Sequence, residues 1–133
     1  MPETPETEAR IAKMQKDIEE LKEAMRDSWH ERRESYENRV RNVLERCPNC
    51  ITLWLEIDGT RSVKEIEENL ASEGRKIPHV TLWWSNKKLL KAGLITKVGV
   101  KGGSPIYSKK PWAKELRIDD YVRSMFIEKD SET

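Results

Sequence analysis

Lysine is the residue whose distribution in this chain points most directly to chemistry. Residues 73–117 contain eleven basic and two acidic side chains, although the whole chain carries a formal net charge of only +1. A positive field that is segregated in this way attracts polyanions. Each lysine can neutralise one phosphate, and lysine suits phosphate contact better than the recognition of base edges. We therefore expect a cationic surface for nucleic acid; the alternative is a set of ordinary solvated lysines.

The second candidate for chemistry is the pair Cys47 and Cys50, separated by Pro and Asn. A closed zinc site needs four ligands, so the pair would have to recruit His30 and His79 or the cysteines of a second chain. The spacing also suits a redox-active disulfide, because the N-terminus of a helix lowers the pKa of a thiol. The third interpretation is a helix start with two small, half-buried thiols. These three interpretations stay open, and we expect no bound metal.

Catalytic patterns are missing from the sequence. It has no Gly-x-x-x-x-Gly-Lys phosphate loop and no His-Glu-x-x-His motif, and its two histidines are His30, in a charged helix, and His79, at a helix start. The carboxylates alternate with Lys and Arg as in surface i,i+4 pairs, and they do not converge as an acid–base couple. We expect neither enzyme activity nor a cofactor.

The elements that position the lysines begin with one long helix. Residues 1–7 contain two prolines and are expected to form a disordered tail. Residues 8–46 lack Gly and Pro, and their apolar side chains start with the 3–4 spacing of a coiled-coil seam. Such a helix is about 58 Å long, far more than a small domain can cover. We expect it to dimerise; the alternative is a solvated helix that folds back on its own chain.

Turn and capping signals divide residues 47–111 into three short helices and a hairpin. The signals are Pro48, the capping-box pair Ser62 and Glu65, Pro78 and Gly93. They predict a third helix over 79–92 and, because alternating residues surround a Gly-Gly pair, a basic β-hairpin over 94–110. Residues 112–133 are expected to form an amphipathic helix, over 112–128, and a polar tail.

This succession carries a resemblance to a known family. Residues 62–70, a turn, residues 80–95 with the ending Leu-x-x-x-Gly-Leu-Ile, and a Lys- and Gly-containing hairpin that ends in Tyr107 follow one another in order. Together, over residues 50–110, they resemble the winged helix-turn-helix family of transcription regulators. The implied fold class is mainly α with a small β-hairpin wing, a winged helix-turn-helix flanked by a long N-terminal coiled-coil-like helix and a C-terminal helix.

The resemblance also implies where DNA would bind. The helix before the wing would enter the major groove, and the wing would contact the backbone or the minor groove. On that helix Leu82 and Leu89 lie seven residues apart and should be core. The expected DNA contacts are Thr81, Trp84, Lys87, Lys88, Lys91, Lys97, Lys101, Lys109 and Lys110.

Three residues depart from the family's pattern. Asn86 stands where the family places an aliphatic core residue, so either its amide bonds a neighbouring backbone group or its helix sits shifted. Trp83 and Trp84 replace the small polar and Arg residues that are commoner on such helices. We expect Trp83 to pack in the core together with Leu90. Trp84 either stacks on a sugar or a base, or lies flat under Lys88.

We therefore predict a homodimer that binds double-stranded DNA, as a transcription regulator or a nucleoid-associated protein of the cytoplasm. The predicted dimer contacts are Ile11, Met14, Ile18, Leu21, Met25, Val122, Met125 and Phe126. The N-terminus does not read as a secretory signal, and no charge-free stretch is long enough to cross a membrane. The alternative is an adaptor that uses the winged fold and the long helix to bind proteins without direct DNA contact; a third hypothesis is an accessory subunit of an enzyme.

Overall fold

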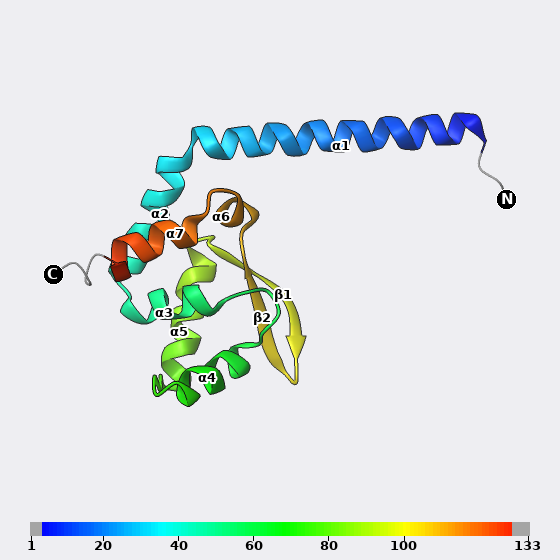
Figure 1. The fold of residues 1–133 in the computed structure, drawn as a ribbon. Helices are drawn as coiled ribbons and strands as arrows, with labels where there is room; N and C mark the ends of the chain where they lie inside the picture. Colours follow the sequence, from blue (N-terminus) through cyan, green and yellow to red (C-terminus); the bar gives the residue numbers. More distant parts are fainter. Residues whose placement is uncertain (1–3, 129–133) are drawn as a thin grey trace.

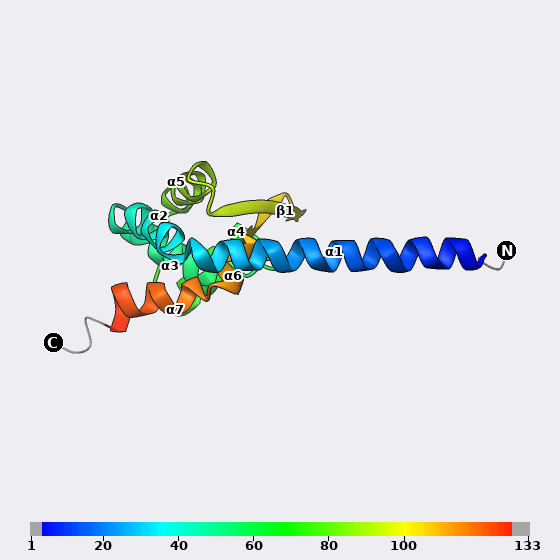
Figure 2. The same cartoon turned by 90° about the horizontal axis from the view of Figure 1, so that it is seen from above.

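The fold is a body of short helices and one hairpin from which a single long helix projects (Figures 1 and 2). We analysed it in a computed structural model that describes residues 4–128. The elements are α1 (Pro5–Glu31), α2 (Arg33–Glu45), α3 (Pro48–Glu56), α4 (Val63–Ser72), α5 (His79–Lys91), β1 (Ile95–Lys101), β2 (Ser104–Lys109), α6 (Pro111–Glu115), α7 (Ile118–Arg123) and the π-helical turn η1 (Ser124–Glu128). The expected mainly helical chain with a small hairpin and a long N-terminal helix is confirmed. Within residues 4–128 no helix is both long enough and apolar enough to cross a membrane.

The N-terminal helix begins earlier and ends sooner than the sequence predicts. Thr4 is its N-cap, its hydroxyl accepts from the N–H of Thr7 at 3.2 Å, and Pro5 occupies the first turn. Proline is tolerated there because the N–H that it lacks would have no partner. The prediction of a disordered tail through residue 7 is therefore wrong for positions 5–7, and residues 1–3 lie outside the described part.

One continuous helix over 8–46 is also wrong, because the helix breaks at Arg32. Contacts with α6 explain the break. Arg33 donates from Nη1 to the carbonyl oxygen of Leu116 at 2.7 Å, and the ring of Tyr36 stacks on that of Trp112 with centroids 4.6 Å apart. These contacts hold α2 against the body, whereas α1 runs on into solvent (Figure 2).

The core lies between α2, α3, α4, α5 and the C-terminal helices. Its fully buried large side chains include Leu44, Trp54, Ile66, Leu70, Leu82, Leu89 and Ile118. The expected burial of Leu82 and Leu89 is confirmed. The capping box at the start of α4 is confirmed as well, because Ser62 accepts from the N–H of Glu65 at 3.2 Å and Glu65 accepts from that of Ser62 at 3.0 Å.

The hairpin forms as the sequence predicts. Strand β1 pairs antiparallel with β2, from Ile95 opposite Lys109 to Lys101 opposite Ser104. Gly102 and Gly103 make the turn with φ of 56° and 79°, values that side chains disfavour. A bridge from Ser62 to Ile106 attaches the hairpin to the start of α4, so the hairpin is anchored beside the helical body.

The C-terminal segment differs most from prediction. Instead of one helix over 112–128, the chain forms α6, α7 and η1, with Arg117 between the first two in the left-handed conformation at φ 53°. Val122 is completely buried in the chain's own core, and Phe126 packs against that core. Val122 is therefore not available as a dimer contact, whereas Met125 and Phe126 remain half-buried.

Candidate nucleic-acid interface

The outer face of α5 is exposed and basic. Leu82, Ser85, Asn86 and Leu89 bury the inner face, which turns Trp84, Lys87, Lys88 and Lys91 toward solvent, while Thr81 is half-buried. No ion pair involves Lys87, Lys88 or Lys91 within residues 4–128. Their charges are therefore free to attract phosphates.

Trp83, Trp84 and Lys87 form one cluster on this face. The two indole rings meet edge to face with centroids 4.9 Å apart, and Nζ of Lys87 lies 5.0 Å from the Trp83 ring and 5.3 Å from the Trp84 ring. The expected core position of Trp83 is wrong, because both tryptophans are 51% exposed and Leu90 is 36% exposed. The cation over Trp84 comes from Lys87 and not from Lys88.

The hairpin adds two exposed lysines, Lys97 and Lys101. Lys101 lies 3.1 Å from a carboxylate oxygen of Glu65 in α4, and this pair is exposed. The N–H of Ser62 and then the ammonium of Lys101 lower the pKa of Glu65. Val98 and Val100 are also exposed. Lys110 is half-buried at the N-cap of α6, where its N–H donates to Leu94.

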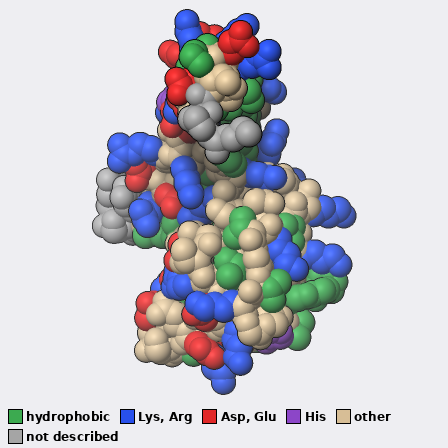
Figure 3. Space-filling view, turned by 90° about the vertical axis from the view of Figure 1, so that its right-hand side faces the viewer, with side chains coloured by type: hydrophobic (Ala, Val, Ile, Leu, Met, Phe, Trp, Pro, Cys, Tyr) green, Lys and Arg blue, Asp and Glu red, His purple; other side chains and the backbone are tan. Residues whose placement is uncertain are grey.

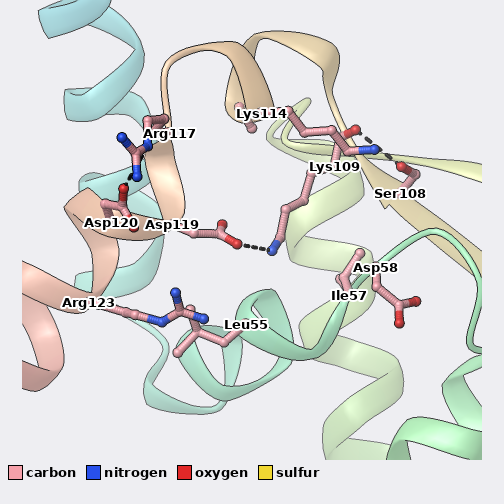
Figure 4. A pocket seen from close by; sticks show the side chains of 11 residues that line it. Leu55, Ile57, Asp58, Ser108, Lys109, Lys114, Arg117, Asp119, Asp120 and Arg123 are labelled. Atoms are coloured by element: carbon pink, nitrogen blue, oxygen red, sulfur yellow. Dashed lines mark hydrogen bonds and ion pairs between the residues drawn. The ribbon is translucent and has the colours of Figure 1, made fainter.

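Lys109 is not available for a phosphate contact. Its side chain is only 8% exposed, and Nζ donates to Oδ2 of Asp119 at 2.8 Å (Figure 4). Nζ also lies 5.1 Å from the ring of Trp54, whose Nε1 donates to the other oxygen of Asp119 at 3.0 Å. Burial lowers the pKa of Lys109, and Asp119 opposes that change. The prediction of a DNA contact at Lys109 is corrected; the residue ties β2 to α3 and α7.

Charges of both signs surround the pocket in which Lys109 lies (Figure 4). Its volume is about 510 Å³, and Lys114, Arg117 and Arg123 line it together with Asp58, Asp119 and Asp120. Arg117 pairs with Asp120 at 2.9 Å. Burial raises the pKa of Asp58, but hydrogen bonds from Arg61 and Thr60 outweigh it, so the pKa lies below its usual range. The near balance of charge gives this pocket little attraction for a polyanion.

The basic side chains of residues 73–117 thus divide mainly between two places. One group lies on α5 and the hairpin, and a second lies around Lys109, where Asp119 and Asp120 are partners. Arg75 belongs to neither group, because it follows α4 and pairs with Glu73 and Glu56. Figure 3 looks onto the hairpin side of the molecule. There the right edge of the lower body carries mainly basic and hydrophobic side chains, whereas acidic ones lie to its left and at the bottom. The hairpin tip stays clear of the long helix (Figure 1).

The two cysteines form a disulfide at the start of α3. Both are buried, and Sγ of Cys47 lies 3.8 Å from Oγ of Ser85 in α5. Oxidised sulfurs offer no thiolate to zinc. No group of three or more possible metal ligands occurs in residues 4–128. His30 and His79 contact Glu115 and Glu67, at 3.2 and 3.1 Å. A redox role for the cysteines stays a prediction.

Arg46 belongs to the basic face although the sequence did not single it out. It lines a pocket of about 430 Å³ with Lys88 and Lys91, where the end of α2 meets α5. The sequence predicted Arg46 at the end of one continuous helix over residues 8–46, and nothing in that prediction placed it beside α5. The bend at Arg32 and the packing of α2 on the body place it there.

Most of the apolar stripe of α1 lies on a part of the helix without contacts to the body, whereas Met25 lines a pocket with Pro111 and Lys114 of α6. Ile11, Met14, Ile18, Leu21 and Met25 are between 38% and 66% exposed. Only Trp29, near the end of the helix, packs against the core. The predicted dimer seam stays a prediction, and its apolar side chains are exposed.

Comparisons with known proteins add no family to this geometry. No family model matches the chain, and neither a curated protein nor a solved structure matches it.

Proposed function

We propose that this chain binds double-stranded DNA through α5 and the β1–β2 hairpin, as a winged helix-turn-helix transcription regulator or nucleoid-associated protein of the cytoplasm. The observation that carries the proposal is the exposed, unpaired set Lys87, Lys88 and Lys91 on one helix face, within residues 4–128. The order α3, α4, α5 and hairpin supports it, since α5 then corresponds to a recognition helix and the hairpin to a wing.

The contacts available to α5 favour affinity over sequence readout. Lysines neutralise phosphates as point charges, and a tryptophan offers base edges a single donor. Sequence preference would then come from DNA shape and deformability more than from direct base contacts. We expect binding to many duplexes with modest discrimination between them.

The dependence of affinity on salt tests this function. Fluorescence anisotropy with a labelled duplex should give a log–log slope near −5 if about six phosphates are contacted per dimer. Changing Lys87 and Lys101 together to Ala should weaken binding to every duplex and make the slope shallower by about one per chain, because Lys101 is already paired with Glu65. Lys13→Ala with Lys16→Ala removes the same charge from α1 and should leave the slope unchanged. A slope near zero for the unmodified protein would favour the adaptor.

The exposed stripe of α1 supports a homodimer as the binding species. Ile11, Met14, Ile18 and Leu21 have coiled-coil spacing and are exposed, and a second copy would bury them. Ile18→Gln with Leu21→Gln should convert the dimer to a monomer by light scattering. The control, Lys16→Gln with Lys22→Gln, alters neighbouring positions off the stripe. A dimer that survives the first pair of changes would show that α1 is not the main contact.

A further inference from the structure

A cavity of about 450 Å³ lies between α4, α5 and the tip of the hairpin. Val63, Trp83, Pro105 and Tyr107 give it apolar and aromatic walls. His79 and Glu67, 3.1 Å apart, and Lys64 add polar and charged groups to its lining. This size and composition are typical of pockets for small organic groups. The cavity adjoins the proposed DNA-binding face, because Trp83 belongs to both.

Asn86 gives the cavity a polar anchor. The residue is only 3% exposed, and Nδ2 donates to the carbonyl oxygen of Leu82 at 3.1 Å. That bond confirms the expected backbone partner and fixes which end of the amide points away from Leu82. The other end, Oδ1, is buried and accepts no hydrogen bond from any described residue. A buried acceptor without a donor destabilises the fold. An aliphatic side chain at position 86 would therefore be more stable, unless a ligand supplies an N–H to Oδ1.

Trp83 lines the same cavity as Asn86. Its indole lines the cavity while remaining 51% exposed, so the ring can change rotamer without disturbing the core. Trp84 is equally exposed but does not line the cavity. A flat ring that enters beside Trp83 and Tyr107 would stack on aromatic side chains and bring an amino group to Oδ1 of Asn86.

We propose that this cavity binds an unpaired nucleobase carrying an exocyclic amino group, as a free nucleoside or as a base turned out of a nucleic-acid strand. The proposal deepens the proposed DNA-binding function and rests on it for the strand-borne case. The stacking walls accept any base, whereas the acceptor Oδ1 requires an N–H donor. Lys64, which also lines the cavity, would supply a positive charge to a phosphate attached to that base.

Two matched ligands test the requirement for the donor. The full chain is titrated with a duplex that has one bulged adenine and with the same duplex bearing N6,N6-dimethyladenine, which bends the DNA alike but has no N–H. We expect about tenfold tighter binding of the bulged adenine, the effect of one hydrogen bond to a buried acceptor. Equal affinity for the two duplexes would overturn the proposal.

Variants on one helix separate the cavity from the outer face. Asn86→Leu, in which melting by circular dichroism checks the fold, should abolish the preference for adenine over dimethyladenine. Trp83→Ala should weaken binding of the bulged adenine and reduce its preference over dimethyladenine, whereas Trp84→Ala should leave that preference unchanged. Equal loss of preference in both tryptophan variants, or a preference that survives Asn86→Leu, would contradict the cavity.

Free adenosine distinguishes the two sources of the base. Calorimetric binding of adenosine, lost with N6,N6-dimethyladenosine and in Asn86→Leu, would assign a nucleoside site; binding of the bulged duplex alone would assign a strand-borne base. The fully paired duplex and its salt slope report on the proposed function separately. Adenosine binding without paired-duplex binding would support the cavity and contradict the DNA-binding function. Paired-duplex binding with neither adenosine binding nor a preference for the bulged adenine would support the DNA-binding function and contradict the cavity.

Discussion

Two groups of lysines from the same basic segment have opposite environments. Lys87, Lys88 and Lys91 lie on the exposed face of α5, whereas Lys109 is enclosed between Trp54 and Asp119. The difference comes from the acidic stretch that follows, because α7 brings Asp119 to the end of β2. A charge total over a segment therefore predicts a field but not which of its charges reach solvent. Three predictions test this contrast, in order of decreasing effect.

The largest effect is expected on stability, from Lys109→Met. Methionine keeps the apolar stem but leaves Asp119 without its ammonium partner. We expect the free energy of unfolding to fall by about 2 kcal/mol, less than for a fully buried pair because Asp119 is 37% exposed. Urea denaturation measures the change. Adding Asp119→Asn should recover part of the loss, and Lys87→Ala should alter stability by less than about 0.5 kcal/mol. Equal losses of stability in Lys109→Met and Lys87→Ala would contradict the difference in environment between the two lysines.

A second effect is expected on DNA binding, where the exposed lysines of α5 should matter and the enclosed Lys109 should not. Lys88→Ala together with Lys91→Ala should make the salt slope shallower by about two per chain, since each lysine neutralises one phosphate. Lys109→Met should leave the slope unchanged, because its charge is already paired. Anisotropy titrations at several salt concentrations, under conditions where each variant is folded, provide the measurement. A shallower slope for Lys109→Met would place that residue at the DNA after all.

The smallest effect concerns pH and Asp58, which lies at the pocket of Lys109. Burial raises its pKa, but the hydrogen bonds from Arg61 and Thr60 lower it further, to below the ordinary value. A carboxyl with a depressed folded pKa stabilises the fold above its unfolded pKa of about 4 and loses that contribution as pH falls through the folded value. Asp58→Asn should therefore lower stability at pH 7 by less than about 1 kcal/mol, given its partial exposure. The difference in the free energy of unfolding between Asp58→Asn and the unmodified protein should become smaller below pH 4. A difference that stays constant with pH would show that the charge of Asp58 is not its cause.

Local signals in the sequence predicted the central helices and the hairpin well. Ser62 with Glu65, Gly93, and the Gly102-Gly103 turn act through bonds and φ angles within a few residues. The seven-residue spacing of Leu82 and Leu89 placed the inner face of α5 correctly. The lysines of that helix were consequently predicted on exposed faces.

Contacts between distant segments caused the errors. The break at Arg32 depends on Leu116 and Trp112, more than 70 residues away in the chain, and carries no Gly or Pro signal. The pairing of Lys109 with Asp119 and the burial of Val122 depend on how α7 folds back. Trp83 was assigned to the core because Leu90 follows it by seven residues, but α5 buries the face of Leu82 and Leu89 instead. Asn86, by contrast, was marked because it stands where the resembled family has an aliphatic core residue, and a buried amide needs a partner.

The bend at Arg32 makes α1 a lever. The helix runs about 40 Å from that joint, so a rotation of about 10° there displaces its far end by about 7 Å. That displacement is close to the rise of two base pairs. In a dimer joined through α1, small repacking of Trp29 and Tyr36 against α6 would therefore reset the separation of the two basic faces, and with it the distance between half-sites that the pair can span at once.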